Sequence, residues 1–208
     1  TSWTRPRMGK PGLWLIRPSG QQRIPLTNDP NVFDVQPSFS PDGRRVAFIR
    51  GREPQSANSV CVCNVDGSEL RQLAASSGGP DWFFSPVWAT DSRLYFTRDF
   101  RLKHLRGRGM ELWQVELDGG EPRLVFGFQG ALGHAGGMAT DISPDRQQLA
   151  VVAQTQGPLA TTDVYLTDLN GKLLHVLWTD GSNGRKDARA LWSPDGKRIA
   201  WCHYFTES

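Results

Sequence analysis

Basic side chains are concentrated in one segment of the chain, from Arg98 to Gly109, where their chemistry is suited to holding an anion. The segment has five Lys or Arg residues against a single acid, a local charge of +4 in a chain whose formal net charge is +3. With the histidine of the segment, the candidate binding residues are Arg98, Arg101, Lys103, His104, Arg106 and Arg108. A cationic surface attracts anionic partners through a long-range field, with an affinity that falls as salt rises. The plainer alternative is a solvated loop without a ligand.

A second candidate is His134, which lies among five glycines between Gly127 and Gly137. Glycine lets a backbone approach a ligand closely, and an imidazole can donate a hydrogen bond or titrate near neutral pH. The segment lacks the Gly-Lys-Ser/Thr ending of a phosphate-binding loop. We therefore expect either a ligand cradle around His134 or, as the plainer alternative, a flexible connector.

Residues suited to catalysis or metal binding form no recognised pattern. The four histidines are scattered, and the sequence has neither a Gly-x-Ser-x-Gly elbow nor a His-x-x-x-His pair. Asp42, Asp145 and Asp195 fall in a repeated turn, where an aspartate side chain usually caps backbone amides. The sequence thus predicts no catalytic residue, no metal site and no cofactor.

The three cysteines are predicted to be structural. Most residues aligned with Cys61, Cys63 and Cys202 in the other repeats are apolar, so cysteine stands in for a small hydrophobic residue. Two cysteines that are two residues apart on one strand have nearly parallel side chains, which is a poor geometry for a disulfide. A bridge between Cys61 and Cys202 and a metal site are the less favoured alternatives.

The elements that would position these residues repeat about every fifty residues. Four copies of a strand, turn and strand pattern occupy residues 37–48, 86–96, 140–151 and 190–201. The first turn is Ser40-Pro41-Asp42-Gly43, in which proline presets φ, aspartate tolerates the third position and glycine takes a positive φ. The second and third copies lack part of this motif, and we expect their turns to be less regular. The apolar runs after the turns are typical of strands covered on both faces.

A second set of hairpins lies between the first. Strands that end in a glycine turn recur at residues 13–20, 60–67, 112–119 and 164–171, so each period contains two hairpins and therefore four strands. Four-stranded sheets that stack face to face around an axis are the blades of a β-propeller. The sequence predicts an all-β propeller in one domain, residues 1–208, with blades at about 35–75, 85–127 and 139–178.

Half a blade remains at each end of the chain. Residues 13–27 supply a second hairpin, and residues 190–204 supply a first hairpin. Together they could form one composite blade that closes a four-bladed ring; the alternative is a segment of a larger propeller. Tryptophans fall at two aligned positions, Trp14 with Trp113 and Trp88 with Trp192, and we expect all four to pack between blades.

The repeat resembles that of TolB-like, WD40-like propellers. The likeness rests on the Ser-Pro-Asp-Gly turn, the Pro-x-aromatic sequence before it and the Arg-x-Val-Ala-Phe sequence after it, and it extends from about Leu13 to Tyr204. Such repeats occur in periplasmic TolB, in the propellers of prolyl-oligopeptidase-like peptidases, in tricorn-type proteases and in oligogalacturonate lyases. The resemblance implies a propeller fold and a periplasmic or other extracytoplasmic location, with the cytoplasm as the alternative.

Long connections are expected to share one face of the propeller, opposite the short turns. They are residues 51–58, 76–84, 98–110, 127–138, 153–162 and 179–188. Because loops on a rigid scaffold often carry function, we expect a non-enzymatic scaffold that binds a protein or peptide through this face. The basic segment favours an acidic partner.

Two enzyme-related functions remain as alternatives. The chain could be the accessory propeller of a prolyl-oligopeptidase-like peptidase, or a reduced oligogalacturonate-lyase-like enzyme that acts on an anionic polysaccharide through His134 and the arginines. Nucleic acid is not expected, since the charge balance is mild and the basic residues match no known nucleic-acid-binding motif. Membrane insertion is not expected either, because no stretch approaches the roughly 20 apolar residues of a membrane helix.

Overall fold

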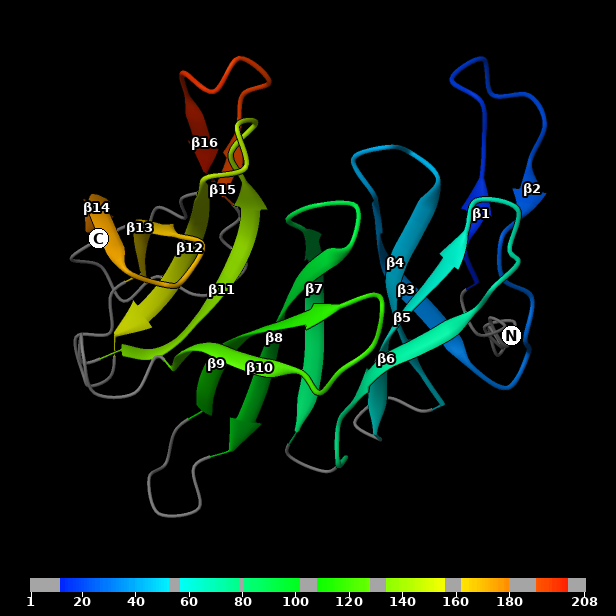
Figure 1. Cartoon of the computed structure of the whole chain (residues 1–208), viewed down its shortest axis with the longest axis horizontal. Helices are drawn as coiled ribbons and strands as arrows, with labels where there is room; N and C mark the ends of the chain where they lie inside the picture. The colour runs from blue at the N-terminus through cyan, green and yellow to red at the C-terminus, as the bar shows by residue number, and fades with distance from the viewer. Residues whose placement is uncertain are drawn as a thin grey trace, which may run out of the picture.

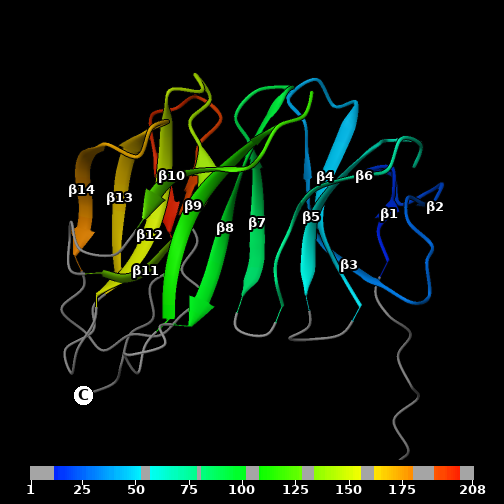
Figure 2. The same ribbon diagram turned by 60° about the horizontal axis from the view of Figure 1, so that its bottom comes forward.

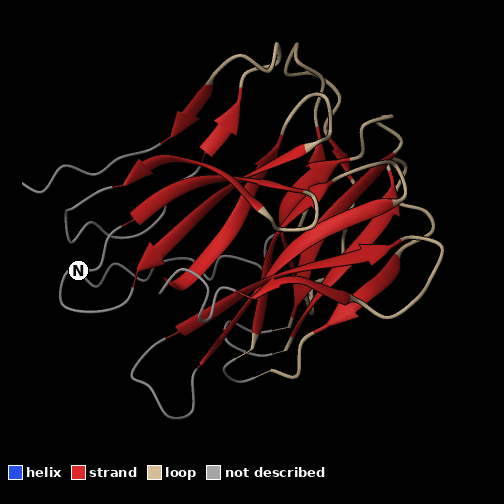
Figure 3. Ribbon diagram, turned by 60° about the vertical axis from the view of Figure 1, so that its left-hand side comes forward, coloured by secondary structure: helices blue, strands red, loops and turns tan. Residues whose placement is uncertain are grey.

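The computed structural model describes residues 12–52, 57–78, 81–101, 108–127, 134–155, 162–179 and 190–201. Every regular element within these ranges is a β-strand, and none of the residues in them is helical (Figure 3). The all-β class predicted from the sequence is confirmed.

Of the sixteen strands in the described residues, twelve form three antiparallel sheets of four strands each. The first blade consists of β3 (Phe33–Phe39), β4 (Arg45–Gly51), β5 (Asn58–Asn64) and β6 (Arg71–Ala75). The second consists of β7 (Trp82–Trp88), β8 (Arg93–Arg101), β9 (Arg108–Glu116) and β10 (Arg123–Gly127). The third consists of β11 (His134–Ile142), β12 (Gln148–Thr155), β13 (Thr162–Asp168) and β14 (Leu173–Thr179).

The blades stand in a row along an open arc (Figures 1 and 2). Within each blade, strands that are neighbours in the chain are neighbours in the sheet. The first strands β3, β7 and β11 contact one another in turn, and β11 also contacts β15. This arrangement of consecutive four-stranded meanders is the predicted propeller architecture, and the prediction is confirmed.

The two terminal hairpins form separate two-stranded sheets. One contains β1 (Trp14–Leu15) and β2 (Ile24–Pro25), and the other contains β15 (Ala190–Trp192) and β16 (Ile199–Trp201). They lie at opposite ends of the arc (Figure 1), and no hydrogen-bonded pairing joins them within the described residues. Of the two predicted alternatives, the composite blade is therefore not formed in this structure, and the described residues have the open form of a propeller segment.

Side-chain hydrogen bonds explain the repeated turns. In the first, Ser40 Oγ donates to Asp42 Oδ1 at 2.5 Å, and the same carboxylate oxygen accepts from the Arg44 amide at 2.9 Å. These bonds, that from Ser40 first, lower the pKa of Asp42. The predicted capping role of the turn aspartates is confirmed. The third copy of the motif lacks the glycine but still forms the turn, because Arg146 takes the glycine position with a φ of 61°.

The apolar core lies between blades. Side chains alternate between the two faces of each strand, so Ala47 and Ile49 of β4 pack against the second blade, whereas Val46 and Phe48 pack against β1–β2. Similar clusters join the second blade to the third and the third blade to β15–β16. Each blade therefore buries its apolar surface on its neighbours.

The cysteines and tryptophans test this packing. Cys61 and Cys63 are buried, free thiols in the cluster between β1–β2 and the first blade, so their predicted structural role is confirmed; Cys202 lies outside the described residues. Trp88 is 2% exposed and packs between blades, as predicted. The prediction is wrong for Trp14, which is 61% exposed because no sheet lies on its side of β1–β2 in the part of the chain that is described.

The short turns lie at the upper ends of the blades in Figure 2, and the strand ends that flank the long connections lie on the opposite side. Several strands extend further toward the connection side than the sequence predicted. The second blade includes Arg98 to Arg101 and Arg108 to Met110, and the third includes His134 to Met138. The predicted loops are shorter as a result, because the antiparallel hydrogen-bond ladder continues through their flanks.

Candidate functional site

A cavity of about 430 Å³ lies between the first and second blades. One wall comes from β6 and the connection after it, including Gln72 and Ser77, and the other comes from β8 and β9 through Phe96 and Trp113. Glu121 and Pro122 line the cavity from the short turn between β9 and β10, whereas Ser77 and Asp81 lie in the connection between the two blades. The cavity thus extends along the blade interface toward the side of the long connections.

The base of the cavity is aromatic and well fixed. Phe83 of β7 and Phe96 of β8 are both buried, with ring centroids 4.9 Å apart at an angle of 59°. Tilted aromatic pairs at this separation are favourable. Rigid rings here give the cavity an apolar base that a ligand could contact without rearrangement of the core.

Arg98 supplies the positive charge of the cavity wall. Its Nη2 donates to Asp81 Oδ2 at 3.0 Å, and its Nη1 lies 3.4 Å from Glu111 Oε2. The guanidinium carbon also lies 5.4 Å from the ring centre of Phe100 and 5.7 Å from that of Trp113, within the range of cation–π attraction. Two carboxylates and two rings therefore hold one cation, whose side chain is 32% exposed.

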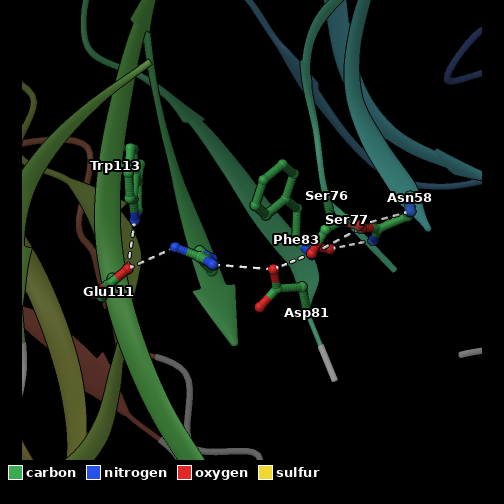
Figure 4. Close-up of polar contacts among 8 residues, drawn as sticks. Asn58, Ser76, Ser77, Asp81, Phe83, Glu111 and Trp113 are labelled. Atoms are coloured by element: carbon green, nitrogen blue, oxygen red, sulfur yellow. Dashed lines mark hydrogen bonds and ion pairs between the residues drawn. The ribbon is translucent and has the colours of Figure 1, made fainter. Parts of the chain in front are cut away.

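The two carboxylates are themselves held by neutral donors. Ser77 Oγ donates to Asp81 at 2.5 Å, and Trp113 Nε1 donates to Glu111 at 2.9 Å (Figure 4). Burial, the largest single influence, acts to raise the pKa of Asp81, but the hydrogen bonds from Ser77 and Arg98 outweigh it and the pKa is lowered. Asp81 is therefore ionised at neutral pH, and this cluster of one cation and two anions has a net negative charge.

A buried amide joins the two blades beside this cluster. Asn58 of β5 is 1% exposed; its Nδ2 donates to the Phe83 carbonyl at 2.6 Å, and its Oδ1 accepts from the Phe83 amide at 2.9 Å (Figure 4). The Asn58 backbone amide donates to Ser76 Oγ at 2.9 Å. These bonds imitate a strand pairing between blades and fix the position of Phe83.

Arg98 is the predicted site residue whose side chain the structure describes, and it lines this cavity. Arg101 and Arg108 face each other as backbone partners at the ends of β8 and β9, and His134 begins β11 opposite Thr155. Lys103, His104 and Arg106 lie outside the described residues. Arg98 differs from the prediction in that it belongs to a strand and already contacts two acids, so the positive charge expected of it is locally offset.

Sequence reasoning missed the residues that hold Arg98. Asp81 precedes an aromatic strand, and Glu111 stands directly across from Arg98 in the register of β8 and β9. Continuing the antiparallel pairing of the second and third strands of this blade outward from their apolar parts would have predicted the Glu111 contact. No signal in the sequence places Asp81 or Asn58 there, because their contacts join segments of different blades.

The described residues form neither a metal-binding cluster nor a membrane-spanning helix. No group of three or more His, Cys, Asp or Glu side chains within them could hold a metal ion. Likewise, the described part of the chain contains no helix that is long and apolar enough to cross a membrane.

Solved structures with the same fold include three that illustrate its range. TolB from Acinetobacter baumannii matches with a TM-score of 0.66 at 16% identity, over 95% of this chain and 44% of that protein. An oligogalacturonate lyase in complex with manganese matches with a TM-score of 0.67 at 14% identity, over 91% of this chain and 52% of the lyase. A prolyl endopeptidase matches with a TM-score of 0.59 at 18% identity, over 88% of this chain and 28% of the peptidase.

The chain therefore has the fold of TolB-like β-propellers, as the repeat predicted, and it spans about half or less of the length of these three proteins. Identities this low concern the fold, which proteins of different function share. No protein-family model matches the sequence, and no curated protein is similar to it in sequence.

Proposed function

We propose that the chain is a non-enzymatic, TolB-like propeller that binds a protein or peptide through the face formed by its long connections. The observation that supports this most directly is the cavity at the first blade interface, which combines an aromatic base with a few ionised side chains. Ligand sites are typically concave and apolar with a small number of polar groups, and about 430 Å³ lies within their size range. A peptide on the connection face could insert one large side chain there.

The proposed partner carries an acidic segment. The charges that would attract it belong to Arg101, Lys103, His104, Arg106 and Arg108, with His134 as a further hydrogen-bond donor. Arg98 would act through its position in the cavity wall, because Asp81 and Glu111 already offset its charge. On this proposal the basic segment attracts the acidic partner, and the cavity with its Arg98 cluster receives one of the partner's side chains.

The enzyme-related alternatives have less support. Both the accessory-propeller function and the lyase function rest on a fold that proteins of several activities share, and the described cavity has no feature that favours either. A periplasmic or extracytoplasmic location is part of our proposal, on the strength of the TolB-like fold. Fractionation of cells that express the protein would test it, and recovery in the cytoplasm alone would contradict it.

Binding of synthetic peptides tests the proposal. The probes are an Asp/Glu-rich peptide with one phenylalanine and a Lys/Arg-rich counterpart, titrated by fluorescence anisotropy at increasing salt. We expect the acidic peptide to bind more tightly, with an affinity that falls as salt rises. The paired substitution Arg101→Glu with Arg106→Glu should weaken binding about tenfold or more at low salt, since charge reversal replaces attraction by repulsion.

A matched control separates a local effect from a change in net charge. Arg17→Glu with Arg23→Glu makes the same charge change at exposed positions of the first hairpin, away from the basic segment. Equal loss of binding in the two pairs would mean that only net charge matters and would contradict the proposed face. Tighter binding of the Lys/Arg-rich peptide would contradict the proposed acidic partner.

A further inference from the structure

Each complete blade has a row of three residues that lie opposite one another across its first three strands. The rows are Asp34, Arg50 and Ser59 in the first blade, Phe83, Arg98 and Glu111 in the second, and Gly137, Ala153 and Asp163 in the third. In the first two rows, the arginine of the middle strand forms an ion pair with the acid of its row. The third row has an acid but no basic residue.

The acid of the third row is buried. Asp163 is 3% exposed; its Oδ2 accepts a hydrogen bond from Tyr165 Oη at 2.6 Å, and its Oδ1 is buried without a hydrogen-bond partner. Burial, and then the bond to Asp163, raise the pKa of Tyr165, so its hydroxyl remains a donor at neutral pH. No arginine or lysine among the described residues forms an ion pair with Asp163. Because burial of a carboxylate without a cation is costly, this position is suited to a cationic ligand.

Asp163 and Tyr165 repeat the pair that holds Arg98 in the second blade. In both blades the aromatic residue lies two positions after the acid and donates to it, Trp113 Nε1 to Glu111 at 2.9 Å and Tyr165 Oη to Asp163. The guanidinium of Arg98 lies against the first of these pairs, with Nη1 3.4 Å from Glu111 and the guanidinium carbon 5.7 Å from the Trp113 ring centre. The third blade therefore has the acid and the ring of a guanidinium site, with alanine at the position of the arginine.

Asp163 faces the interface between the second and third blades. Side chains alternate along a strand, and Tyr165, on the same face as Asp163, packs with Tyr95 in the core between these blades. The same alternation places Thr97 and Asp99 of β8 at this interface; both are buried, and Thr97 Oγ1 has no hydrogen-bond partner. Both blades thus contribute buried oxygen atoms, which suit a cation with several N–H donors.

The other two residues of the third row are small. Alanine has only a methyl group as its side chain and glycine has none, so Ala153 and Gly137 add less bulk beside Asp163 than the aligned residues add in the other two blades. Ala153 is two residues before the end of β12, and Asp163 is the second residue of β13. The row therefore lies close to the side of the long connections, from which a ligand would enter.

We propose that the interface between the second and third blades binds the guanidinium group of a ligand, with Asp163 as its anion and the ring of Tyr165 as its stacking surface. The guanidinium would lie on the third blade as that of Arg98 lies on the second. A planar group with five N–H donors bonds to a carboxylate and stacks on a ring at the same time, which an ammonium group does less well. The inference is independent of the proposed acidic partner, because any ligand with a guanidinium group would satisfy it.

Titration with a small guanidinium probe tests the site directly. The probes are N-acetyl-arginine amide and its uncharged counterpart N-acetyl-norleucine amide, with binding followed by NMR chemical shifts. We expect the arginine probe to bind at least about tenfold more tightly than the norleucine probe, and Asp163→Asn to weaken its binding about tenfold or more. Asp118→Asn makes the same charge change at an exposed turn and is the control. Equal binding to the unsubstituted protein and to Asp163→Asn would overturn the proposal.

An arginine supplied by the chain itself tests the same site without a ligand. Ala153→Arg places a guanidinium opposite Asp163, as Arg98 is placed opposite Glu111. We expect the midpoint of thermal unfolding to rise by about 2–4 °C, and binding of the arginine probe to fall about tenfold or more. Ala153→Met, which has a long side chain without charge, is the control.

The combined variant Ala153→Arg with Asp163→Asn should lose the gain in the unfolding midpoint. A gain that persisted in the combined variant would show that Asp163 is not the anion of the site. If Ala153→Arg does not fold, the titrations of the unsubstituted protein and of Asp163→Asn decide the question on their own.

Further probes identify what carries the guanidinium. Equal affinities for methylguanidinium and N-acetyl-arginine amide would support the site and indicate a small guanidinium compound as the ligand. Tighter binding of a short alanine peptide with one central arginine, by about tenfold, would support the site and indicate an arginine of a partner protein. Equal affinities for N-acetyl-lysine amide and N-acetyl-arginine amide would contradict the proposal, because the site would then select only a positive charge.

Discussion

The first and second blades have an arginine at the same point of the repeat and hold it in different ways. Arg50 of β4 donates two hydrogen bonds to Asp34, at 2.7 and 2.8 Å, and the side chain of that aspartate is 1% exposed. Arg98 of β8 contacts Asp81 at 3.0 Å and Glu111 at 3.4 Å. The first arginine is closed into a bidentate pair, and the second is shared between two acids at the wall of a cavity.

A single cross-strand position accounts for the difference. Asp34 faces Arg50 across β3 and β4, and the aligned position of the second blade, opposite Arg98, is occupied by Phe83. The phenylalanine cannot pair with the guanidinium, so the acids come from the preceding connection and from β9. Its ring forms the base of the cavity instead. The two repeats thus share one backbone arrangement, and the side chain opposite the arginine decides between a closed ion pair and the wall of a cavity.

The largest expected loss of stability comes from breaking the ion pair between Arg50 and Asp34. Asp34→Asn keeps the shape of the side chain but leaves the Arg50 charge without its bidentate partner, and loss of one member of a buried ion pair costs about 3 kcal/mol or more. Denaturant unfolding measures the change in free energy. The control is Asp118→Asn at an exposed position of a turn. Equal stability of the two variants would contradict a structural role for the pair.

Removal of the amide that joins the blades should have the next largest effect. Asn58→Ala deletes both side-chain hydrogen bonds to the Phe83 backbone and leaves a buried amide and carbonyl unpaired, at a cost of about 2 kcal/mol. Asn64→Ala removes only an exposed bond to Ser68 and serves as the control. If unfolding showed no difference between these variants, the amide would not hold the two blades together.

The Arg98 cluster, in which Asp81 and Glu111 share the arginine, should tolerate loss of an acid better than the pair of Arg50 and Asp34 does. Asp81→Asn should cost about 1 kcal/mol at neutral pH, because Arg98 is partly exposed and keeps Glu111 as a partner. A loss as large as that of Asp34→Asn would mean that the two clusters are equivalent. The ratio of the two effects, measured by denaturant unfolding, is therefore the direct test of the comparison.

The contribution of Asp81 should also depend on pH. Its pKa is lower in the folded protein than in the unfolded chain, so the stabilisation is complete above the unfolded value, near 4, and is lost as the pH falls through the folded value. The difference in stability between the unsubstituted protein and Asp81→Asn should consequently shrink below pH about 4. A difference that grew on acidification would contradict this account.

The smallest expected effect concerns Trp113. Trp113→Phe removes the hydrogen bond from the indole to Glu111 but keeps a ring near Arg98, and a partly exposed bond of this kind is worth about 0.5 kcal/mol. Unfolding should be nearly unchanged, whereas binding of the acidic peptide reports any change in the shape of the cavity. A loss above about 2 kcal/mol would show that the packing of Trp113 against the core between the first and second blades outweighs its hydrogen bond.

Sequence reasoning predicted the features that depend on local residues. The Ser-x-Asp turns, the alternating apolar strands and the four-stranded period follow from turn chemistry and periodicity, and even the worn turn at Arg146 forms because its hydrogen bonds to Ser143 and Asp145 persist. The sequence predicts the basic segment, residues 98–110, as one long connection because it falls between two hairpins of the repeat. In the structure the strand ladder continues through its flanks, since backbone pairing does not depend on those side chains.

The cavity could not be predicted because its parts come from different blades. Asn58 contacts Phe83, and Asp81 contacts Arg98, only once neighbouring sheets have stacked. Similarly, two hairpins that complement each other in sequence predicted a composite blade, but whether they meet depends on the angle between successive blades. That angle arises from the packing of all the interblade cores and is not encoded in any one repeat.

The sharing of every apolar core between two sheets has a consequence for local opening of the structure. A unit whose stability resides in contacts with its neighbours behaves as one member of a row of coupled units, and the members at the ends have fewer couplings than those in the middle. Amides of β8 and β9 should exchange with deuterium most slowly, and those of β1–β2 and β15–β16 should exchange fastest. Any contact that joins the two ends should slow amide exchange along the whole row of sheets, and not only in the strands that it touches.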